Sequence, residues 1–568
     1  MRKYIPAAFA TLACVAYDPD ATAADPKRAL LLLFAIVCAS LPLSQFDWRM
    51  RPPLRLGAVF LGLSAISVLW GRWSGVLDLA TWCGAATLGW AAARGGEVDA
   101  RASARIVAMF VGAIVSAWAL LAFAMGHRGF GVHAGQGNPN WLGLLLAIAL
   151  PLSLDWSPRQ GRPLKMAVVA IQVPAIFVSH SRVGWAAAAI SVLLVVSVAA
   201  YARRREAALM LLALGIGCGI ALGIAASDRA AATKIVTAKE LLDAPDRQVE
   251  ATPLRSLEGR IWIWRNSIDA ARENLPFGVG LGGFGHAYLD AQGKRLGELS
   301  PRSAARQFVN ATTAHQDYLQ VSVESGPLTL LVLAACLASA LVALFRARWV
   351  SGAAAILAFA LCMLGDSPMR HPAPCVLICL VLFGLPKGDG APDGKWSIWL
   401  TVCARLSLAG LLAMSTECWM ASRALTSAER ADPASRVRLL SRATSLAPWS
   451  GEAHLARGLH LLGQGQLHES AICLTKADRH LANVGTKTAI GELRLAEGSP
   501  VAVDAFRSAL AWHPGSLRAR MGLAEAYRRC GKLASAEEQA RVAVSLAPGE
   551  SRAIDLLESI LADLIDAE

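Results

Sequence analysis

The sequence predicts an all-α protein in two parts, a polytopic helical membrane domain of about 12–13 spans and a soluble helical solenoid. Of the 568 residues, 55% are apolar and only 17% are charged, whereas ordinary globular domains carry about 25% charged residues. Apolar runs long enough to cross a bilayer recur up to about residue 420. Beyond that point the chain is charged and amphipathic at helical spacing. We therefore expect a membrane domain in residues 1–420 and the solenoid in residues 421–568.

The first apolar run, Ile5–Tyr17, follows a short basic start. Residues 1–24 fit either a first span or a cleaved signal peptide, and an uncleaved span is favoured because further spans follow at once. The remaining predicted spans are approximately 28–45, 54–71, 75–93, 104–126, 140–155, 164–181, 183–201, 207–226, 317–345, 350–365, 373–386 and 397–419.

The basic residues give these spans an orientation. With the N-terminus inside, the loops that hold two or three basic residues, such as Arg203–Arg205 and Arg346–Arg348, fall on the cytoplasmic side. The net charge of +13 is therefore explained by basic residues that orient the spans, and it does not indicate nucleic-acid binding. A long polar loop, about 228–316, and the whole C-terminal part then face outward. We predict a multi-pass protein of a bacterial inner membrane with its C-terminal domain in the periplasm.

The C-terminal part carries an internal repeat. The spacing between Pro514 and Pro548 equals the period of the tetratricopeptide repeat (TPR). Gly451–Leu481 is a looser copy, and Ser551–Ala567 is expected to be a capping helix, so about three repeats are predicted. Small or aromatic residues fall on the packing positions of the repeat: Ala502, Phe506, Ala509, Leu523, Ala524, Tyr527, Ala536, Ala540 and Ala543.

Two polar clusters lie at predicted outer ends of spans. Asn138 and Asn140 bracket a proline just before a span, where a turn with a helix cap competes with a substrate-binding role. Arg182 lies in a very short connection between two apolar runs. A charged side chain at membrane depth is costly and commonly faces a polar partner or cavity, although it can also extend to the interface.

The third cluster begins in the long polar loop, in the segment LEGRIWIWRNSIDAARENLPFGVGLGGFG from Leu257. Arg260 and Trp264 are one helical turn apart and share a face. Arg265 lies on another face, where a solvated pairing of Asp269 with Arg272 competes with substrate binding. Arg260 is therefore the preferred catalytic guanidinium.

The glycines that follow formally spell GxGxxG, from Gly278 to Gly283. A nucleotide site is not expected, because Pro276 rather than a strand precedes them. Such glycines are better suited to a close approach of the backbone to a ligand or another helix.

His315 and Gln316 stand just before the next apolar run. Arginines match phosphate oxygens with paired donors, and a histidine can accept a proton from a sugar hydroxyl near neutral pH. No paired carboxylates of glycosidase type and no DxD-type metal motif stand out in the sequence. The pattern therefore favours metal-free transfer from a phosphate leaving group, with no cofactor.

Several of these segments resemble the O-antigen ligase and polymerase superfamily of integral membrane glycosyltransferases. The matching pieces are GNPNWLGLLLA, SHSRVGW, GRIWIWRNSIDAARENLPFGVGLGGF, AHQDYLQVSVESG and GDSPMRHPAP, in family order over residues 25–390. The resemblance implies an undecaprenyl-diphosphate-type glycan donor, no metal, and inversion at the anomeric carbon. It also implies that Arg182 and Arg260 bind the diphosphate and that His315 lies near the acceptor. The chain departs from the family in having Gln316 where His is often followed by Asn.

The sequence thus predicts a membrane glycosyltransferase that moves a lipid-linked saccharide to a hydroxyl acceptor, as in lipopolysaccharide biosynthesis. Its catalytic residues would be His315 and Arg260, with Arg182, Arg265, Trp264, Asn138, Asn140 and Gln316 as substrate contacts. The acceptor could be a lipid A core, a glycan chain or, as a protein O-oligosaccharyltransferase, a protein. A non-catalytic membrane-anchored scaffold, whose solenoid binds protein partners, is the second alternative.

Overall fold

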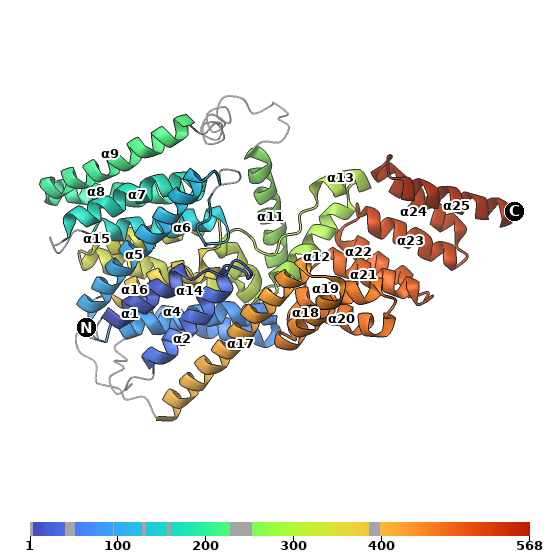
Figure 1. Ribbon diagram of the computed structural model, residues 1–568, viewed down its shortest axis with the longest axis horizontal. Coiled ribbons are helices and arrows are strands. Elements are labelled where there is room, and N and C mark those ends of the chain that lie inside the picture. The colour runs from blue at the N-terminus through green and yellow to red at the C-terminus, as the bar shows by residue number, and fades with distance from the viewer. Residues whose placement is uncertain are drawn as a thin grey trace.

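The computed structural model describes residues 4–39, 52–94, 96–127, 132–155, 161–227, 253–385 and 398–567. In these ranges every regular element is a helix, as predicted. The apolar helices form a bundle at one end of the molecule, and the C-terminal helices form an elongated solenoid at the other (Figure 1). Helix α11 (Pro253–Glu273) stands between the two parts.

Each predicted span corresponds to a helix. Within the described ranges, five helical segments are long and apolar enough to cross a membrane, and four more are apolar but shorter. The helices of this part are α1 (Ile5–Val15), α2 (Ala24–Ala39), α3 (Pro52–Ser67), α4 (Trp73–Ala92), α5 (Glu97–Ala124), α6 (Pro139–Ser153), α7 (Arg162–Val178), α8 (Arg182–Ala202), α9 (Arg204–Ser227), α14 (Asp317–Arg346), α15 (Val350–Cys362), α16 (Pro372–Phe383) and α17 (Ile398–Arg430).

Helix α6 lies at the centre of the bundle. Its residues from Leu142 to Ser153 are all buried, because the helix packs against α5, α7, α8, α15 and α16. A helix that is apolar on all sides is stable only when neighbours surround it. The side chain of Asn138 accepts a hydrogen bond from the Asn140 backbone N–H at 2.8 Å and caps the helix. The start of α6 is therefore set by the Asn-Pro-Asn turn.

The long polar loop is largely helical. Residues 228–252 lie outside the described residues, and α11 is followed by α12 (Phe284–Gly297) and the short α13 (Pro301–Gln307). An extended segment then leads to α14. The described part of the loop therefore leads from the membrane domain, where α11 packs against α14, to the solenoid, where α13 packs against α24 (Figure 1).

The glycine-rich segment between α11 and α12 packs against backbone. The N–H groups of Val279 and Gly280 donate to the carbonyls of Val323 and Glu324 at 2.9 and 2.8 Å. Gly280 has a φ of 85°, and a Cβ there would collide with the backbone of Gly71. This agrees with the prediction that the glycines permit close approach to another helix.

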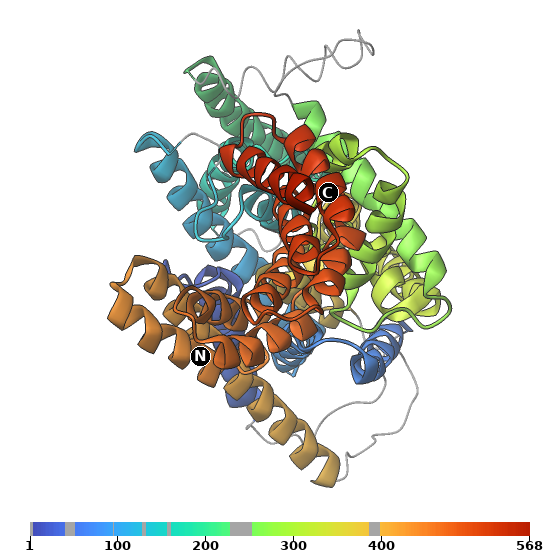
Figure 2. The ribbon, with the colours of Figure 1, turned by 90° about the vertical axis from the view of Figure 1, so that its right-hand side faces the viewer.

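The C-terminal part folds as three helical hairpins and a capping helix, as the repeat predicted. The hairpins pair α19 (Gly451–Gly463) with α20 (Leu467–His480), α21 (Val484–Ala496) with α22 (Ala502–Trp512), and α23 (Leu517–Arg529) with α24 (Leu533–Leu546). Helix α25 (Ser551–Ala567) caps the stack. Helix α18 (Pro433–Leu446) pairs with α17, so the proposed division at residue 420 falls inside one continuous helix. Figure 2 shows the solenoid end on.

Candidate active site

Arg260 and His315 converge on a buried carboxylate, Asp366, in the connection between α15 and α16. Asp366 is 3% exposed. Its Oδ2 lies 3.8 Å from Arg260 Nη2, and its Oδ1 lies 3.6 Å from His315 Nδ1. Arg260 Nη1 also donates to the Gly365 carbonyl at 2.5 Å. The two predicted catalytic residues, which are distant in the sequence, therefore share one partner.

The polar groups around Asp366 keep its carboxylate ionised. Burial by itself would raise the pKa of Asp366, but the His315 ring, the Arg260 guanidinium and the Ser367 backbone N–H together hold that pKa below its usual range. The Ser367 N–H donates to Asp366 Oδ1 at 2.9 Å. The His315 Nδ1 atom lies 3.6 Å from the same oxygen, slightly beyond hydrogen-bonding distance. Asp366 is thus an anion at neutral pH.

The environment of His315 leaves one ring nitrogen available. Nδ1 is buried and faces Asp366, while the side chain as a whole is 41% exposed. The backbone of His315 has a φ of 49°, a left-handed conformation that costs energy in a residue with a Cβ. Trp264 Nε1 donates to the preceding carbonyl, that of Ala314, at 3.1 Å. The imidazole is therefore held with Nδ1 inward.

Gln316 lies beside the same turn. Its Nε2 donates to the Leu364 carbonyl at 3.4 Å, and the Asp317 N–H donates to the Met363 carbonyl at 3.0 Å. These bonds attach the start of α14 to the end of α15. Trp264 and Gln316 thus orient His315 through backbone contacts.

The first turn of α8, which begins at Arg182, lies near this site. A Cβ on Gly365 would lie 2.5 Å from Val183 Cγ2, so the first turn of α8 packs directly against the residue before Asp366. Arg182 itself is exposed and has no hydrogen bond or ion pair with any residue that the structure describes. The structure therefore places the start of α8 near the site but shows no contact between the Arg182 side chain and Asp366.

The other predicted contacts are placed differently. Asn138 caps α6, and the ring of the adjoining Trp141 lies 3.7 Å from that of His371, in the same connection as Asp366. Arg265 is exposed and has no partner among the described residues. The structure therefore does not bring Arg265 to Asp366, and Asn138 has a structural role.

Two charged residues near this site were not among the sequence candidates. Asp366 is one, and Arg370 is the other. The Arg370 guanidinium forms ion pairs with Asp78 of α4 and, at 2.5 Å, with Glu324 of α14. Their position in an apolar bundle is the signal that could have identified them, because both lie in GDSPMRHPAP, between two apolar runs.

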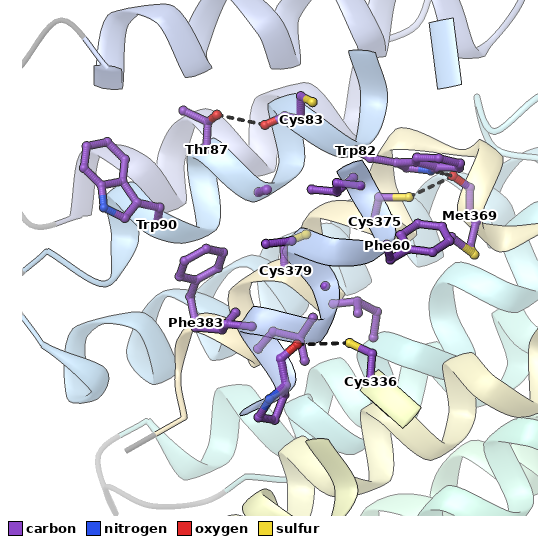
Figure 3. A pocket seen from close by; sticks show the side chains of 18 of the residues that line it. Phe60, Trp82, Cys83, Thr87, Trp90, Cys336, Met369, Cys375, Cys379 and Phe383 are labelled. Atoms are coloured by element: carbon purple, nitrogen blue, oxygen red, sulfur yellow. Dashed lines mark hydrogen bonds between the residues drawn. The ribbon is translucent and has the colours of Figure 1, made fainter. Parts of the chain in front are cut away.

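An apolar cavity of about 500 Å³ lies between α3, α4, α14, α16 and α17 (Figure 3). Trp82, Phe60, Cys375 and Met369 gather at one end, and Trp90 and Phe383 lie on the other side. Trp82 Nε1 donates to the Met369 carbonyl at 2.7 Å, and Met369 directly precedes Arg370. The cavity thus extends from the Asp366–Arg370 connection into the apolar bundle.

Comparisons with known proteins match two parts of the chain to described families. Residues 166–334, which include Arg182, Arg260 and His315, match the family model described as O-antigen ligase, and residues 500–560 match the tetratricopeptide repeat. No curated protein matches the chain. A solved structure, "Crystal structure of APC/C hetero-tetramer Cut9-Hcn1", aligns with 84% of this chain and 90% of the chain in that structure, at 10% sequence identity. Its TM-score of 0.24 is too low to indicate a shared fold. The chain is therefore a multi-pass helical membrane protein in which residues 166–334 match the O-antigen ligase family model and residues 500–560 match the tetratricopeptide repeat.

Proposed function

We propose that the chain transfers a saccharide from a polyprenyl diphosphate to a hydroxyl acceptor at the periplasmic face of the inner membrane. The convergence of Arg260 and His315 on buried Asp366 carries this proposal. A glycosyl diphosphate needs cationic donors for its phosphates and a base for the incoming hydroxyl. This site supplies both kinds of group.

The proposed reaction is a single displacement. We expect the 3.6 Å contact between Asp366 and His315 Nδ1 to shorten to a hydrogen bond when substrate binds, which would hold the proton on Nδ1 and leave Nε2 a free lone pair to remove the proton of the acceptor hydroxyl. The acceptor oxygen attacks the anomeric carbon as the bond from that carbon to the diphosphate oxygen breaks, and the configuration inverts. The lipid diphosphate leaves with the bonding electrons, and Arg182 and Arg260 stabilise its negative charge.

The apolar cavity is the proposed site for part of the lipid tail. Its lining of aromatic, aliphatic and cysteine side chains offers burial to a hydrocarbon chain. Because Met369, three residues after Asp366, lines one end of this cavity, we propose that a diphosphate at the site and a tail in the cavity belong to one bound molecule.

The test is transfer by the purified full-length protein in lipid nanodiscs, with a polyprenyl-diphosphate oligosaccharide as donor. Arg260→Ala and His315→Ala are each expected to lower the transfer rate by at least about 100-fold, because each removes a group needed in the transition state. Arg272→Ala is the matched control, since Arg272 lies on the same helix, is 75% exposed and forms only a 3.9 Å pair with Asp269. Full activity of both site variants would exclude the proposed chemistry.

The acceptor is identified by presenting lipid A core, a second lipid-linked glycan and a Ser/Thr-rich protein in parallel. Glycan profiles of cells that lack the protein provide an independent reading. Loss of glycan on lipid A indicates a ligase, single-unit glycans indicate a polymerase, and loss of protein glycosylation indicates a protein O-oligosaccharyltransferase. Unchanged glycans in all three would favour the scaffold alternative.

A further inference from the structure

One edge of the solenoid contacts the membrane domain and the long polar loop at corresponding positions of successive repeats. Each contact lies at or just after the C-terminal end of the second helix of a hairpin. After α18, the ring of Trp449 stacks on Trp73 at 5.7 Å. At the end of α20, the carbonyl of Arg479 accepts from Arg72 Nη1 at 2.6 Å. The later turns contact the long polar loop instead.

Helix α12 fits against the end of α22. Trp512 Nε1 donates to Asp290 Oδ1 at 2.6 Å. Gly293, about one turn later on α12, leaves no room for a Cβ beside the Ala511 carbonyl. This contact is therefore both hydrogen-bonded and closely packed.

Two further contacts extend the interface beyond α12. The ring of His513 stacks on Phe308 at 3.9 Å. Arg302 Nε donates to the Ser545 carbonyl at 2.5 Å. The long polar loop is thus held at the ends of both α22 and α24.

The same interface belongs to a shared hydrophobic core. Ile263 and Ala270 of α11, Tyr288 of α12, and Phe506 and Leu523 of the solenoid are members of one buried cluster. The long polar loop and the solenoid thus have a common core, whereas most of the membrane bundle belongs to a separate cluster. Separation of the two would expose apolar surface on both sides.

Gln292 connects α12 to both parts of the candidate site. Its side chain is fully buried. Its Oε1 accepts from Trp262 Nε1 at 2.9 Å, and its amide exchanges two hydrogen bonds with the Val309 backbone, at 3.0 and 3.1 Å. Trp262 lies on the same helix as Arg260, and Val309 begins the extended segment that ends at His315. One amide therefore holds the helix of Arg260 and the segment of His315 together.

We propose that the tetratricopeptide solenoid is a structural part of the transferase centre. It clamps α12 through Trp512, and α12 positions Arg260 and His315 through Gln292. Trp512 and Gln292 are thus positioning residues. The kinetic part of this inference rests on the proposed function, whereas the clamp itself does not.

The experiment compares two tryptophans on the same edge of the solenoid in the full-length protein. Trp512→Phe keeps an aromatic ring and removes the N–H that binds Asp290. Trp449→Phe is the matched control, because it removes an N–H that binds Cys418 Sγ at 3.3 Å, far along the chain from α12. Hydrogen exchange of peptides covering 258–273 and 308–316 is measured together with kcat and KM per folded molecule.

The expected result is faster exchange in both peptides for Trp512→Phe and no change for Trp449→Phe. In parallel, kcat falls by about three- to tenfold with KM nearly unchanged, because misplaced catalytic groups slow the chemical step. Asp290→Ala combined with Trp512→Phe is expected to be no worse than either change alone, since both disrupt one contact. Unchanged exchange in both peptides, or equal effects of the two tryptophan variants, would refute the clamp even if transfer itself is confirmed.

Discussion

The candidate site is arranged around the carboxylate of Asp366, which contacts both predicted catalytic residues. A buried charge is costly unless it is paired, and here the partners are Arg260 and His315. Because the pKa of Asp366 is held below its usual range, its stabilising contribution is complete at neutral pH and is lost only as the pH falls through that lowered value. Asp366 is thus expected to act by orienting two other residues.

Replacement of this carboxylate tests that role. Asp366→Asn is expected to lower kcat for transfer by about 10- to 100-fold, the size of effect seen when a partner that orients a functional histidine is lost. Asp504→Asn is the control, because Asp504 is 77% exposed and forms only a 3.7 Å pair with Arg507. Steady-state kinetics on both variants decide the matter, and equal kcat values would contradict an orienting role.

The sequence predicted Arg260, His315 and Arg182 as site residues from their motif order and their places at the ends of spans, and the structure brings Arg260 and His315 to one carboxylate. The sequence did not identify Asp366, because a single carboxylate in a turn between two apolar runs has no periodicity. The argument applied to Arg182, that a charge at membrane depth requires a partner, applies equally to Asp366. Arg265 was predicted to lie on a different helix face from Arg260, and it is exposed in the structure.

At the scale of elements, the apolar runs predicted the positions of the helices well. A single apolar run in lipid can pair its backbone N–H and C=O groups internally by forming a helix. The sequence predicted that the glycine-rich segment would approach a ligand or another helix closely, but it did not predict which part of the chain that would be. Only the fold brings Gly280 to Gly71, which stands far earlier in the chain, and to the kinked start of α14, where Gly326 has a φ of 80°.

Gly280→Ala tests whether this approach is required. The substitution places a Cβ at a φ of 85° and against the backbone of Gly71, so a loss of at least about 2 kcal/mol in the free energy of unfolding is expected. Gly259→Ala in α11 has nothing within 4 Å of the new Cβ and is expected to gain about 0.5–1 kcal/mol. Thermal unfolding of the solubilised proteins measures both, and a stabilising Gly280→Ala would contradict the packing.

At the scale of the molecule, the repeat period predicted the solenoid and its cap but not what the solenoid contacts. Packing positions recur once in each repeat, whereas Trp512 and His513 bind a loop that lies far earlier in the chain. Contacts of that kind leave no periodic trace in one sequence. Similarly, α17 continues through the predicted boundary because a change from apolar to amphipathic residues does not require a helix to end.

The docked His513 makes the interface sensitive to acid. Burial lowers its pKa from 6.5 to about 4, and its Nδ1 has no partner in the described part of the chain. The stabilisation that depends on the neutral ring is complete above pH 6.5 and is lost as the pH falls toward 4. The melting temperature of the wild type is therefore expected to fall more steeply over that interval than that of His513→Phe, which keeps a flat ring against Phe308. Parallel curves for the two proteins would argue against this role.

The way the solenoid edge meets the rest of the chain also bears on how such a protein can evolve. Tandem arrays commonly gain or lose units by duplication, since each unit contacts only its neighbours. Here the turn after α18 meets Trp73, the turn after α22 meets Asp290, and the end of α24 meets Arg302. An extra repeat inserted before α21 would move every later turn away from the residue that it contacts. We therefore expect the number of repeats to vary less among homologues of this protein than in solenoids that contact no other domain.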